Sequence, residues 1–382
     1  MRVGVDYTAA IRQDAGIGRY TRELLKALVT TRTHAFAVLA AVAGRQPQWL
    51  EQRAALRSAS ADQAQLSFYG LGLTDDWLAR IWQRLRLPLL PEWLMGHVDL
   101  FFSPDFVLPP LRKATRALLT VHDLSFLRHP ETFPRPLRNY LEQAVPRSIQ
   151  RADHVLADSF ATRQDLADLL GVPENRVSVL HLGVDQTFSA STASDEAEVL
   201  YARYGVARRP YILAVGTLQP RKNYIRLMEA CDPLTSRGAL DLVIVGRPAW
   251  MSAPILEAAA LRPYVHILGF AADGDLPALY RQARLLAFPS LYEGFGLPPL
   301  EAMACGTPVV ASAASSIPEA VGDAGLLLDP LDTQLWTDTI YRVLNEPELR
   351  HRLRAAGLAR VQMFTWERAA TEWLRTVDGM VS

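Results

Sequence analysis

Short apolar runs alternate with amphipathic stretches along the whole chain. In the first half, apolar residues recur with helical periodicity in Tyr20–Leu28 and Leu137–Ile149. Between such stretches lie runs that we expect to be strands: Arg2–Asp6, Phe36–Val42, Leu66–Tyr69, Leu100–Ser103, Leu118–His122, Val155–Ser159 and Val177–Leu182.

A second series of the same kind follows a polar stretch of small residues, Ser189–Glu198, which is the best candidate for a linker. Its expected strands are Tyr211–Gly216, Leu242–Gly246, Val265–Gly269, Leu285–Pro289, Val309–Ser312 and Leu326–Leu328. Near-continuous apolar strands joined by helices are typical of parallel sheets that are buried on both faces. The pattern therefore predicts an α/β protein with two Rossmann-like, doubly wound domains that face each other across a cleft.

Composition narrows the class of protein. A length of 382 residues fits two domains of roughly 150–200 residues each. The formal net charge of zero gives no field that would attract nucleic acid. No apolar run approaches the ~18–20 residues of a membrane span, and the first run meets Asp6 too early for a signal peptide. The only cysteines, Cys231 and Cys305, suit a reducing compartment. We expect a cytoplasmic protein.

The segment Phe288–Met303 combines the features of an anion-binding turn. A buried strand is expected to end at Pro289, and glycines in the following turn, such as Gly296, let backbone N–H groups approach a ligand. Pro298 and Pro299 suit the first turn of a helix, whose free N–H groups and positive end favour a diphosphate.

Two carboxylates belong to this turn. Glu301 is expected within the first turn of the helix, and Glu293 precedes it. Placed on either side of a diphosphate, they can accept hydrogen bonds from hydroxyls of a sugar and a ribose. The alternative is that Glu301 only complements the helix dipole and that Glu293 is a solvated loop residue. For one glutamate that alternative is favoured, whereas the full set of carboxylates, glycines and prolines favours a ligand site.

A second turn carries adjacent cations. Arg221 and Lys222 lie between an expected strand and its helix, where they can neutralise a nucleoside diphosphate leaving group. The alternative is a solvated cationic helix start, which the helix dipole disfavours.

The strand expected at Leu118–His122 ends in His122 and Asp123. A lone histidine at a strand end is usually a satisfied structural residue, but next to an aspartate at the ligand edge of a sheet it is a functional candidate. Asp123 can orient the ring or bind an acceptor. Another turn, Gly16–Gly18, opens a helix whose N–H groups can meet the diphosphate or the acceptor. It lacks the third glycine and the acidic residue of a dinucleotide fingerprint, which argues against an NAD enzyme.

The Glu293–Glu301 segment resembles the E-x7-E motif of the GT-B glycosyltransferases of family 4. The following Ala304–Ser312 continues the resemblance, which extends over nearly the whole chain from Gly16–Tyr20 to Phe364–Trp366. It is closest to the mannosyltransferase-like branch associated with bacterial O-antigen and exopolysaccharide assembly.

The resemblance implies roles for the site residues. Glu293 would bind hydroxyls of the transferred sugar, Glu301 would bind the ribose, and His122 would contact the sugar near its reacting carbon. Backbone groups of three residues would line the donor: Phe295, Gly296 and Leu297. Many members carry an arginine where this chain has Thr217, so the role of that arginine is open. Arg221 is the candidate to assume it, and Thr217 remains a substrate-binding candidate.

The resemblance also implies an organisation and a reaction. An acceptor-binding domain over 1–185 would be followed by a linker over 186–207, a nucleotide-sugar-binding domain over 208–363 and a helix over 364–382 that crosses back to the first domain. We expect a retaining transfer without a metal or other cofactor. The donor would be GDP-mannose or a related GDP-sugar, with a UDP-sugar as the alternative, and the acceptor a glycan or a polyprenyl-linked sugar.

Two further segments have competing interpretations. Asp273-Gly274-Asp275 looks like the D-x-D motif of metal-dependent transferases, but a helix starting at Leu276 needs a cap there, and we favour capping. Trp77–Gly96 has three tryptophans among arginines and leucines, which is typical of an interfacial membrane anchor or, equally, of an amphipathic helix packed on its own sheet.

Two other functions share the fold. A sugar phosphorylase would hold a pyridoxal cofactor on a lysine, and Lys222 is the only lysine of the second half. A non-catalytic nucleotide-sugar-binding protein would be marked by the loss of Glu293, Lys222 or His122, and all three are present. The sequence therefore favours a glycosyltransferase.

Overall fold

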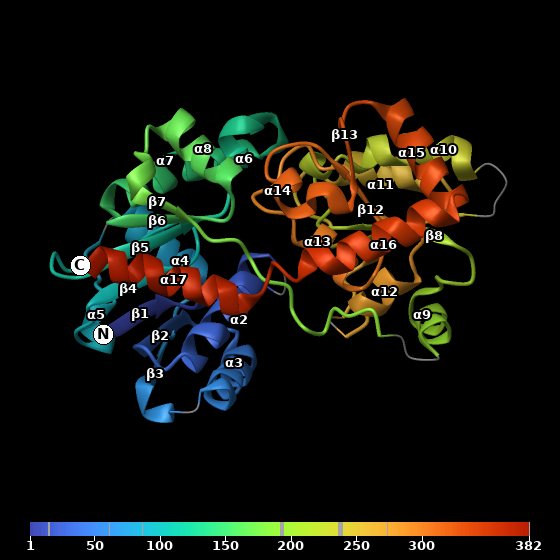
Figure 1. The fold of residues 1–382 in the computed structure, drawn as a ribbon. Coiled ribbons are helices and arrows are strands. Elements are labelled where there is room, and N and C mark those ends of the chain that lie inside the picture. The colour runs from blue at the N-terminus through green and yellow to red at the C-terminus, as the bar shows by residue number, and fades with distance from the viewer. Residues whose placement is uncertain are drawn as a thin grey trace. The chain divides into compact units, whose positions relative to one another are not determined.

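The computed structural model describes residues 1–13, 16–60, 62–85, 87–191, 195–235, 240–272 and 274–381 (Figure 1). The chain forms two compact units. Unit 1 comprises Met1–Leu124, Asn139–Gly183 and Trp366–Ser382, and unit 2 comprises Ser125–Arg138 and Val184–Thr365. Part of the range expected as a linker, 186–207, folds as helix α9 (Glu196–Tyr204) and packs on α12 (Leu276–Gln282) within unit 2.

Unit 1 contains a parallel sheet in the order β3-β2-β1-β4-β5-β6-β7. All strands predicted for the first half are present, with bounds that differ by a few residues. They are β1 (Arg2–Asp6), β2 (Ala35–Ala41), β3 (Leu66–Leu71), β4 (Leu100–Ser103), β5 (Arg116–Val121), β6 (His154–Ala157) and β7 (Val177–Val179).

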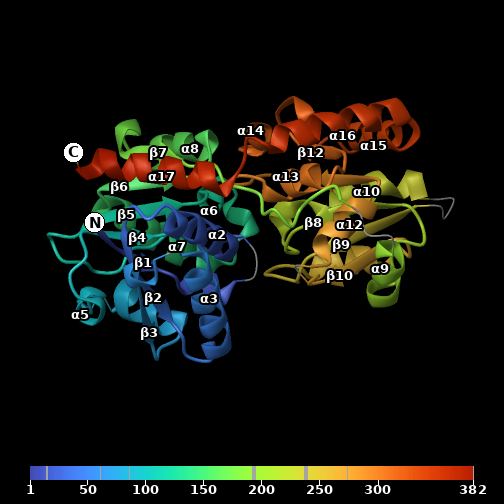
Figure 2. The same cartoon turned by 60° about the horizontal axis from the view of Figure 1, so that its bottom comes forward.

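Helices cover this sheet because each buries one apolar stripe against it. The last helix, α17 (Trp366–Val381), packs beside α2 (Ile17–Thr30) and lies along unit 1 in both views (Figures 1 and 2). Its Trp373 is fully buried and meets the rings of Phe36 and Phe102. The other helices are α1 (Thr8–Arg12), α3 (Gln46–Ala59), α4 (Asp75–Ala79), α5 (Glu92–Met95), α7 (Arg135–Arg151) and α8 (Phe160–Leu170).

Unit 2 contains a second parallel sheet, in the order β10-β9-β8-β11-β12-β13. Its strands are β8 (Tyr211–Val215), β9 (Asp241–Val245), β10 (Val265–Gly269), β11 (Leu285–Phe288), β12 (Val309–Ser312) and β13 (Leu326–Leu328). Its helices include α10 (Tyr224–Thr235), α11 (Ala253–Ala260), α13 (Leu297–Ala304), α14 (Ile317–Val321), α15 (Thr333–Asn345) and α16 (Pro347–Val361). Both sheets are doubly wound, as predicted.

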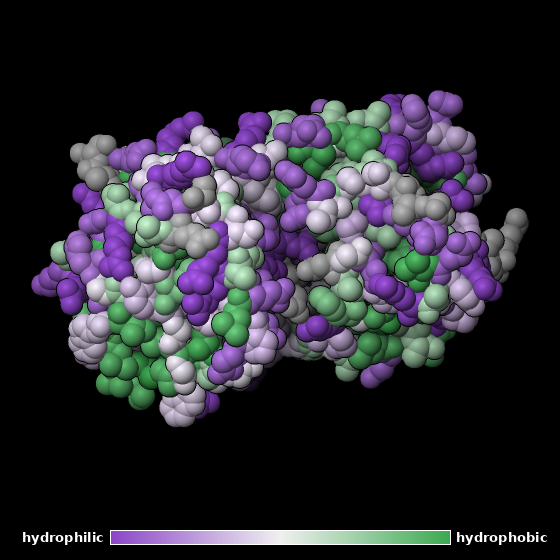
Figure 3. Space-filling model, turned by 90° about the horizontal axis from the view of Figure 1, so that it is seen from below, coloured by the Kyte–Doolittle hydropathy of each residue, from purple (hydrophilic) through white to green (hydrophobic). Residues whose placement is uncertain are grey.

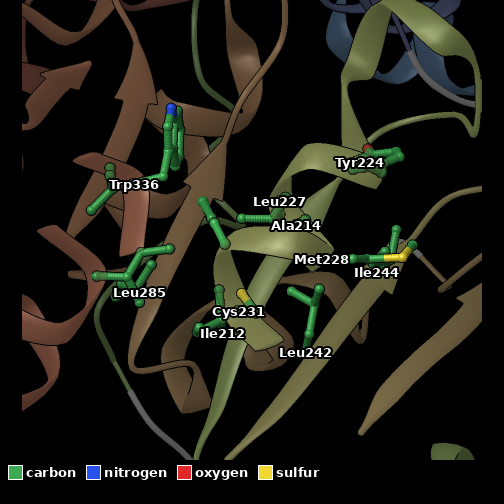
Figure 4. Close-up of a cluster of buried hydrophobic side chains, with 14 of the residues drawn as sticks. Ile212, Ala214, Tyr224, Leu227, Met228, Cys231, Leu242, Ile244, Leu285 and Trp336 are labelled. Carbon is green, nitrogen blue, oxygen red and sulfur yellow. The ribbon is translucent and has the colours of Figure 1, made fainter. Parts of the chain in front are cut away.

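The core of unit 2 shows why the apolar strands form. Ile212 and Ile244 point from neighbouring strands toward Leu227 and Met228 of α10, and Trp336 of α15 closes the cluster (Figure 4). Parallel strands buried in this way need apolar residues at nearly every position, which is the pattern of the sequence.

The strand order also determines where a ligand can bind. In unit 2, β8 has β9 on one side and β11 on the other, so successive strands are added in opposite directions from this point. Doubly wound sheets bind ligands at the carboxyl ends of the strands at such a switch point. The turns that follow β8 and β11 carry Lys222 and Glu293. Unit 1 has the same arrangement, with β1 between β2 and β4.

Candidate donor site

Glu293 accepts two ion pairs from the turn after β8. Its Oε1 lies 2.6 Å from Nζ of Lys222, and its Oε2 lies 2.9 Å from Nη1 of Arg221. Arg221 also donates to the carbonyl of Tyr292. The side chains come from the turns that follow two neighbouring strands of one sheet, since β8 pairs with β11. We call Arg221, Lys222 and Glu293 the ion cluster.

All three residues of the ion cluster are buried. Their exposed fractions are 9% for Arg221, 8% for Lys222 and 8% for Glu293. The alternatives of a solvated loop glutamate and a solvated cationic helix start are therefore wrong. Two cations and one carboxylate leave a net charge of +1, which suits an anionic group such as a diphosphate.

Glu293 is ionised throughout the neutral range. Burial by itself raises the pKa of the carboxyl, but the adjacent Arg221 and Lys222 outweigh burial and lower the pKa to about 2. An ionised carboxylate only accepts hydrogen bonds, so Glu293 can bind sugar hydroxyls and cannot serve as a proton donor at neutral pH.

Gly216 allows Lys222 to take its position. Its φ of +146° is disfavoured for other residues, and a Cβ there would lie 3.2 Å from Cε of Lys222 and 3.0 Å from Oη of Tyr224. The next residue, Thr217, has an exposed side chain. Arg221 stands in the ion cluster, whereas the place of the family arginine is occupied by Thr217.

The helix after the turn begins as predicted but places Glu301 differently. Gly296 is the N-cap of α13, with φ of +116°, and Leu297 and Pro298 begin the helix. Glu301 is the fifth helical residue and therefore lies beyond the first turn, which corrects our prediction. It is buried, and its Oε2 accepts a hydrogen bond of 2.8 Å from the Tyr280 hydroxyl. The sequence carried no signal for this role of Tyr280.

Phe295 is buried in the same turn. Its ring lies 5.7 Å from that of Phe364, measured between centroids. With the side chain packed inside unit 2, Phe295 can offer a ligand only its backbone, as the family resemblance implies.

His122 in unit 1 follows β5 and is 6% exposed. Its Nδ1 lies 2.7 Å from Oδ2 of Asp158, and its Nε2 lies 2.8 Å from the carbonyl oxygen of Pro104. Burial lowers the pKa of the ring, but the Asp158 carboxylate reverses the effect and the pKa is raised to about 9. The ring is thus an imidazolium that donates to two protein oxygens. Asp158, not Asp123, orients it, which corrects one of the two roles expected for Asp123; acceptor binding by Asp123 stays a prediction.

The Gly16–Gly18 turn opens a helix as predicted. Gly16 is the N-cap of α2, with φ of +59°. A Cβ on Gly18 would lie 2.0 Å from the carbonyl oxygen of Gln13, so this glycine permits a close approach of two backbone segments. This close backbone contact by itself explains why position 18 holds a glycine.

Unit 1 holds a charged group that the sequence did not single out. Arg12 of α1 bonds to Asp75 at 3.0 Å and to Asp105 at 3.1 Å. Asp105 follows β4, and Asp6 ends β1, so these groups lie at the carboxyl ends of the strands around the switch point of unit 1. Burial raises the pKa of Asp6. Arg12 is 63 residues from Asp75 and 93 residues from Asp105 along the chain, which hides these ion pairs from sequence patterns.

The D-x-D segment is tied to a neighbouring helix. Asp275 forms an ion pair of 2.6 Å with Arg203 and accepts a hydrogen bond of 2.8 Å from Tyr204. It precedes α12, which starts at Leu276 as predicted, but its side chain makes no capping bond. Asp273 lies outside the described residues. Among the residues that the structure describes, no three His, Cys, Asp or Glu side chains are grouped as metal ligands would be.

Two doubly wound sheets are the architecture of the GT-B fold, and a buried cation–carboxylate cluster lies at the switch point of the second, where such sheets bind ligands. The family model described as Glycosyltransferase Family 4 matches residues 15–188, and the model described as Glycosyl transferases group 1 matches residues 204–360. The chain is 33% identical over 364 residues to the O-antigen chain mannosyltransferase B of Escherichia coli, covering 94% of each protein. The chain belongs to glycosyltransferase family 4 and is a hexosyltransferase.

Other relatives support this assignment. A D-inositol 3-phosphate glycosyltransferase of Salinispora arenicola is 33% identical over 308 residues, which are 76% of this chain and 66% of that protein. Among solved structures, Anabaena HepE in complex with UDP and glucose superposes with a TM-score of 0.72 at 20% identity, over 99% of this chain and 100% of that one. WaaG, a glycosyltransferase involved in lipopolysaccharide biosynthesis, gives a TM-score of 0.66 at 17% identity over 97% and 98%. The structural likenesses show the fold.

Proposed function

We propose that the chain is a retaining, metal-independent hexosyltransferase that moves mannose or a related sugar from a GDP-sugar to a glycan or polyprenyl-linked acceptor in bacterial surface polysaccharide synthesis. The ion cluster carries this proposal, because it holds a hydroxyl-binding carboxylate in contact with two phosphate-binding cations. A sugar–phosphate bond joins a sugar, which carries hydroxyls, to an anionic phosphate, so it presents both kinds of group that the ion cluster can bind.

The ion cluster suggests how the bond is broken. Glu293 accepts hydrogen bonds from hydroxyls of the transferred sugar, while Lys222 and Arg221 neutralise the negative charge that develops on the departing diphosphate. The acceptor hydroxyl attacks the anomeric carbon on the face that the phosphate leaves. The bond from carbon to phosphate oxygen breaks, and the phosphate takes the hydroxyl proton.

Unit 1 would bind the acceptor. Its carboxyl-edge group of Asp6, Arg12, Asp75 and Asp105 offers several hydrogen-bond acceptors and one cation to hydroxyls. His122 carries a positive charge close to the same edge, where it can stabilise negative charge without giving up its proton.

Our choice of donor rests on the names of the related proteins. Several are mannosyltransferases named for O-antigen or serotype-specific synthesis, which favours GDP-mannose, whereas HepE binds UDP and glucose, which keeps UDP-glucose as the alternative. Calorimetry should be run with GDP-mannose, GDP and UDP-glucose on the wild type and on Lys222→Ala. We expect micromolar binding of one donor and about 10²–10³-fold lower turnover in the variant. If no nucleotide sugar binds the wild type, the proposal is wrong.

A second part of the proposal concerns membranes. Figure 3 shows a hydrophobic area on the surface of unit 1. In the segment Trp77–Gly96, Trp77 is 51% exposed and Trp93 60% exposed, and several leucines are exposed with them: Leu85, Leu87, Leu89 and Leu94. No helix among the described residues is long and apolar enough to cross a membrane. We propose that the segment lies on the membrane that carries the polyprenyl-linked acceptor.

The structure selects the residues for a test of this anchor. Trp82 packs against the core of unit 1 and its Nε1 donates to the carbonyl of Leu89, so replacing it would disturb the fold. Trp77 and Trp93 are better targets. Their double replacement by alanine should abolish co-sedimentation with vesicles of anionic phospholipid. Leu261→Ala in unit 2, where the side chain is 81% exposed, is the matched control. Equal binding by all three proteins would exclude the anchor.

A further inference from the structure

Two serines after β12 hold the turn that carries Glu293. They are Ser315 and Ser316, which we call the serine clamp. Ser316 is fully buried, and Ser315 is partly buried. Neither has a charge or belongs to the E-x7-E segment, so no sequence pattern placed them in the site.

Ser316 binds two carbonyl groups of the turn. Its Oγ lies 2.8 Å from the carbonyl oxygen of Glu293 and 2.9 Å from that of Phe295. A hydroxyl has one proton, so the two carbonyls share one donor. They therefore point toward the same atom.

Ser315 holds the turn from a second side. Its Oγ accepts a hydrogen bond of 2.7 Å from the backbone N–H of Glu293 and donates one of 2.9 Å to the carbonyl of the same residue. Its φ of +48° lies in the left-handed region, which is unfavourable for a residue with a side chain. The two hydrogen bonds compensate for this strain.

The clamp controls the direction of an N–H group of the turn. The peptide bonds of the turn are trans, so each carbonyl and the N–H of the next residue point in opposite directions. With the carbonyl of Phe295 turned to Ser316, the N–H group of Gly296 points to the other side of the turn. Gly296 also precedes the positive end of α13.

We propose that the serine clamp is a positioning device for the donor diphosphate. It turns partly negative carbonyl oxygens away from the phosphates and directs the N–H group of Gly296 toward them. The inference rests on the proposed function, because it assumes that a nucleoside diphosphate binds at the ion cluster. Ser315 and Ser316 do not touch the reacting atoms and act through the backbone of the turn.

The test separates the diphosphate from the rest of the nucleotide. The Kd of the nucleoside diphosphate and that of its nucleoside are measured by calorimetry or competition for wild type, Ser316→Ala and Ser316→Thr. We expect Ser316→Ala to weaken diphosphate binding about tenfold, the scale of one charge-assisted hydrogen bond, with the Kd of the nucleoside unchanged. Threonine keeps the hydroxyl and should restore diphosphate binding.

The matched control is Thr235→Ala. Thr235 is buried in α10, and its hydroxyl is also shared by two carbonyls, at 3.1 Å from Cys231 and 3.3 Å from Asp232. It should lose stability without a change in either Kd. Equal losses for nucleoside and diphosphate in Ser316→Ala, or no loss, would overturn the proposal. If Ser316→Ala does not fold, Ser315→Ala gives the same comparison. Failure of the wild type to bind any nucleotide would instead refute the proposed function.

Discussion

Replacing Glu293 by glutamine removes the only negative charge of the ion cluster while keeping the size of the side chain. Lys222 and Arg221 would then be two adjacent cations, each about nine-tenths buried, that have both lost the carboxylate they contact. We expect the variant to fold less stably and to depend on an anionic ligand for its stability.

The magnitude follows from the pKa of Glu293. A carboxyl whose pKa is about 2 in the folded protein instead of 4.5 stabilises the folded state by about 3 kcal/mol at neutral pH. The folded-state pKa is lowered, so this stabilisation is complete above pH 4.5 and is lost as the pH falls toward 2. The stability difference between wild type and Glu293→Gln should therefore shrink to about half at ~pH 3.

Urea unfolding of both proteins at several pH values between 3 and 7 measures this difference. Saturation with a nucleoside diphosphate should reduce the gap at pH 7, because the phosphates supply the missing negative charge. Turnover of the variant should still be about 10²–10³-fold lower, since the sugar hydroxyls lose their acceptor. A gap below ~1 kcal/mol at pH 7, or one that does not change down to pH 3, would refute the reasoning.

Three further predictions concern other parts of the two units. Tyr280→Phe removes the hydroxyl that donates to Glu301 at 2.8 Å. Calorimetry should then show about tenfold weaker binding of the nucleoside diphosphate but unchanged binding of its 2′,3′-dideoxy analogue. Equal losses for both ligands would contradict binding of the ribose by Glu301. Gly18→Ala places a Cβ 2.0 Å from the Gln13 carbonyl oxygen and should cost about 3 kcal/mol in urea unfolding, whereas unchanged stability would mean that the loop before α2 yields easily. The pKa of His122 is raised to about 9, so protonation of the ring stabilises the folded state by about 3 kcal/mol. This stabilisation is complete below pH 6.5 and is lost as the pH rises through 9. An NMR titration that places the ring pKa at or below 6.5 would refute the ion pair.

The elements could be read from the sequence because their signals are local. A buried parallel strand needs a short apolar run, and Val309–Ser312 and Leu326–Leu328 were predicted with the bounds that the structure gives them. Helix starts with proline or glycine, as at α13 and α2, were equally accessible.

The contacts between residues of the site were harder to predict from the sequence. Lys222 and Glu293 were each selected as ligand-binding residues, yet their contact spans a separation of 71 residues and depends on the adjacency of β8 and β11. The error over His122 has the same origin. Asp123 is next in sequence, but Asp158 lies at the end of the neighbouring strand, and pairing of β5 with β6 brings it to the ring.

The serines and Tyr280 could not be found at all. A hydroxyl that orients a backbone or a carboxylate has no distinctive spacing, and serine or tyrosine at such positions is common in any loop or helix. Their roles depend on the direction of single hydrogen bonds, which only coordinates provide. The segment Ser125–Arg138 is a comparable case, because its place in unit 2 rests on contacts such as that between Thr132 and Trp250.

Neither unit is one continuous stretch of chain, and this affects synthesis on the ribosome. The chain passes from one unit to the other after Leu124, Arg138, Gly183 and Thr365. Unit 1 receives α17, with the fully buried Trp373, only after the whole of unit 2 has been synthesised. A nascent chain that stops early would expose the apolar surface that α17 covers, and chaperones and proteases recognise such surface. Completion of the first unit thus reports that the second unit has been translated in full.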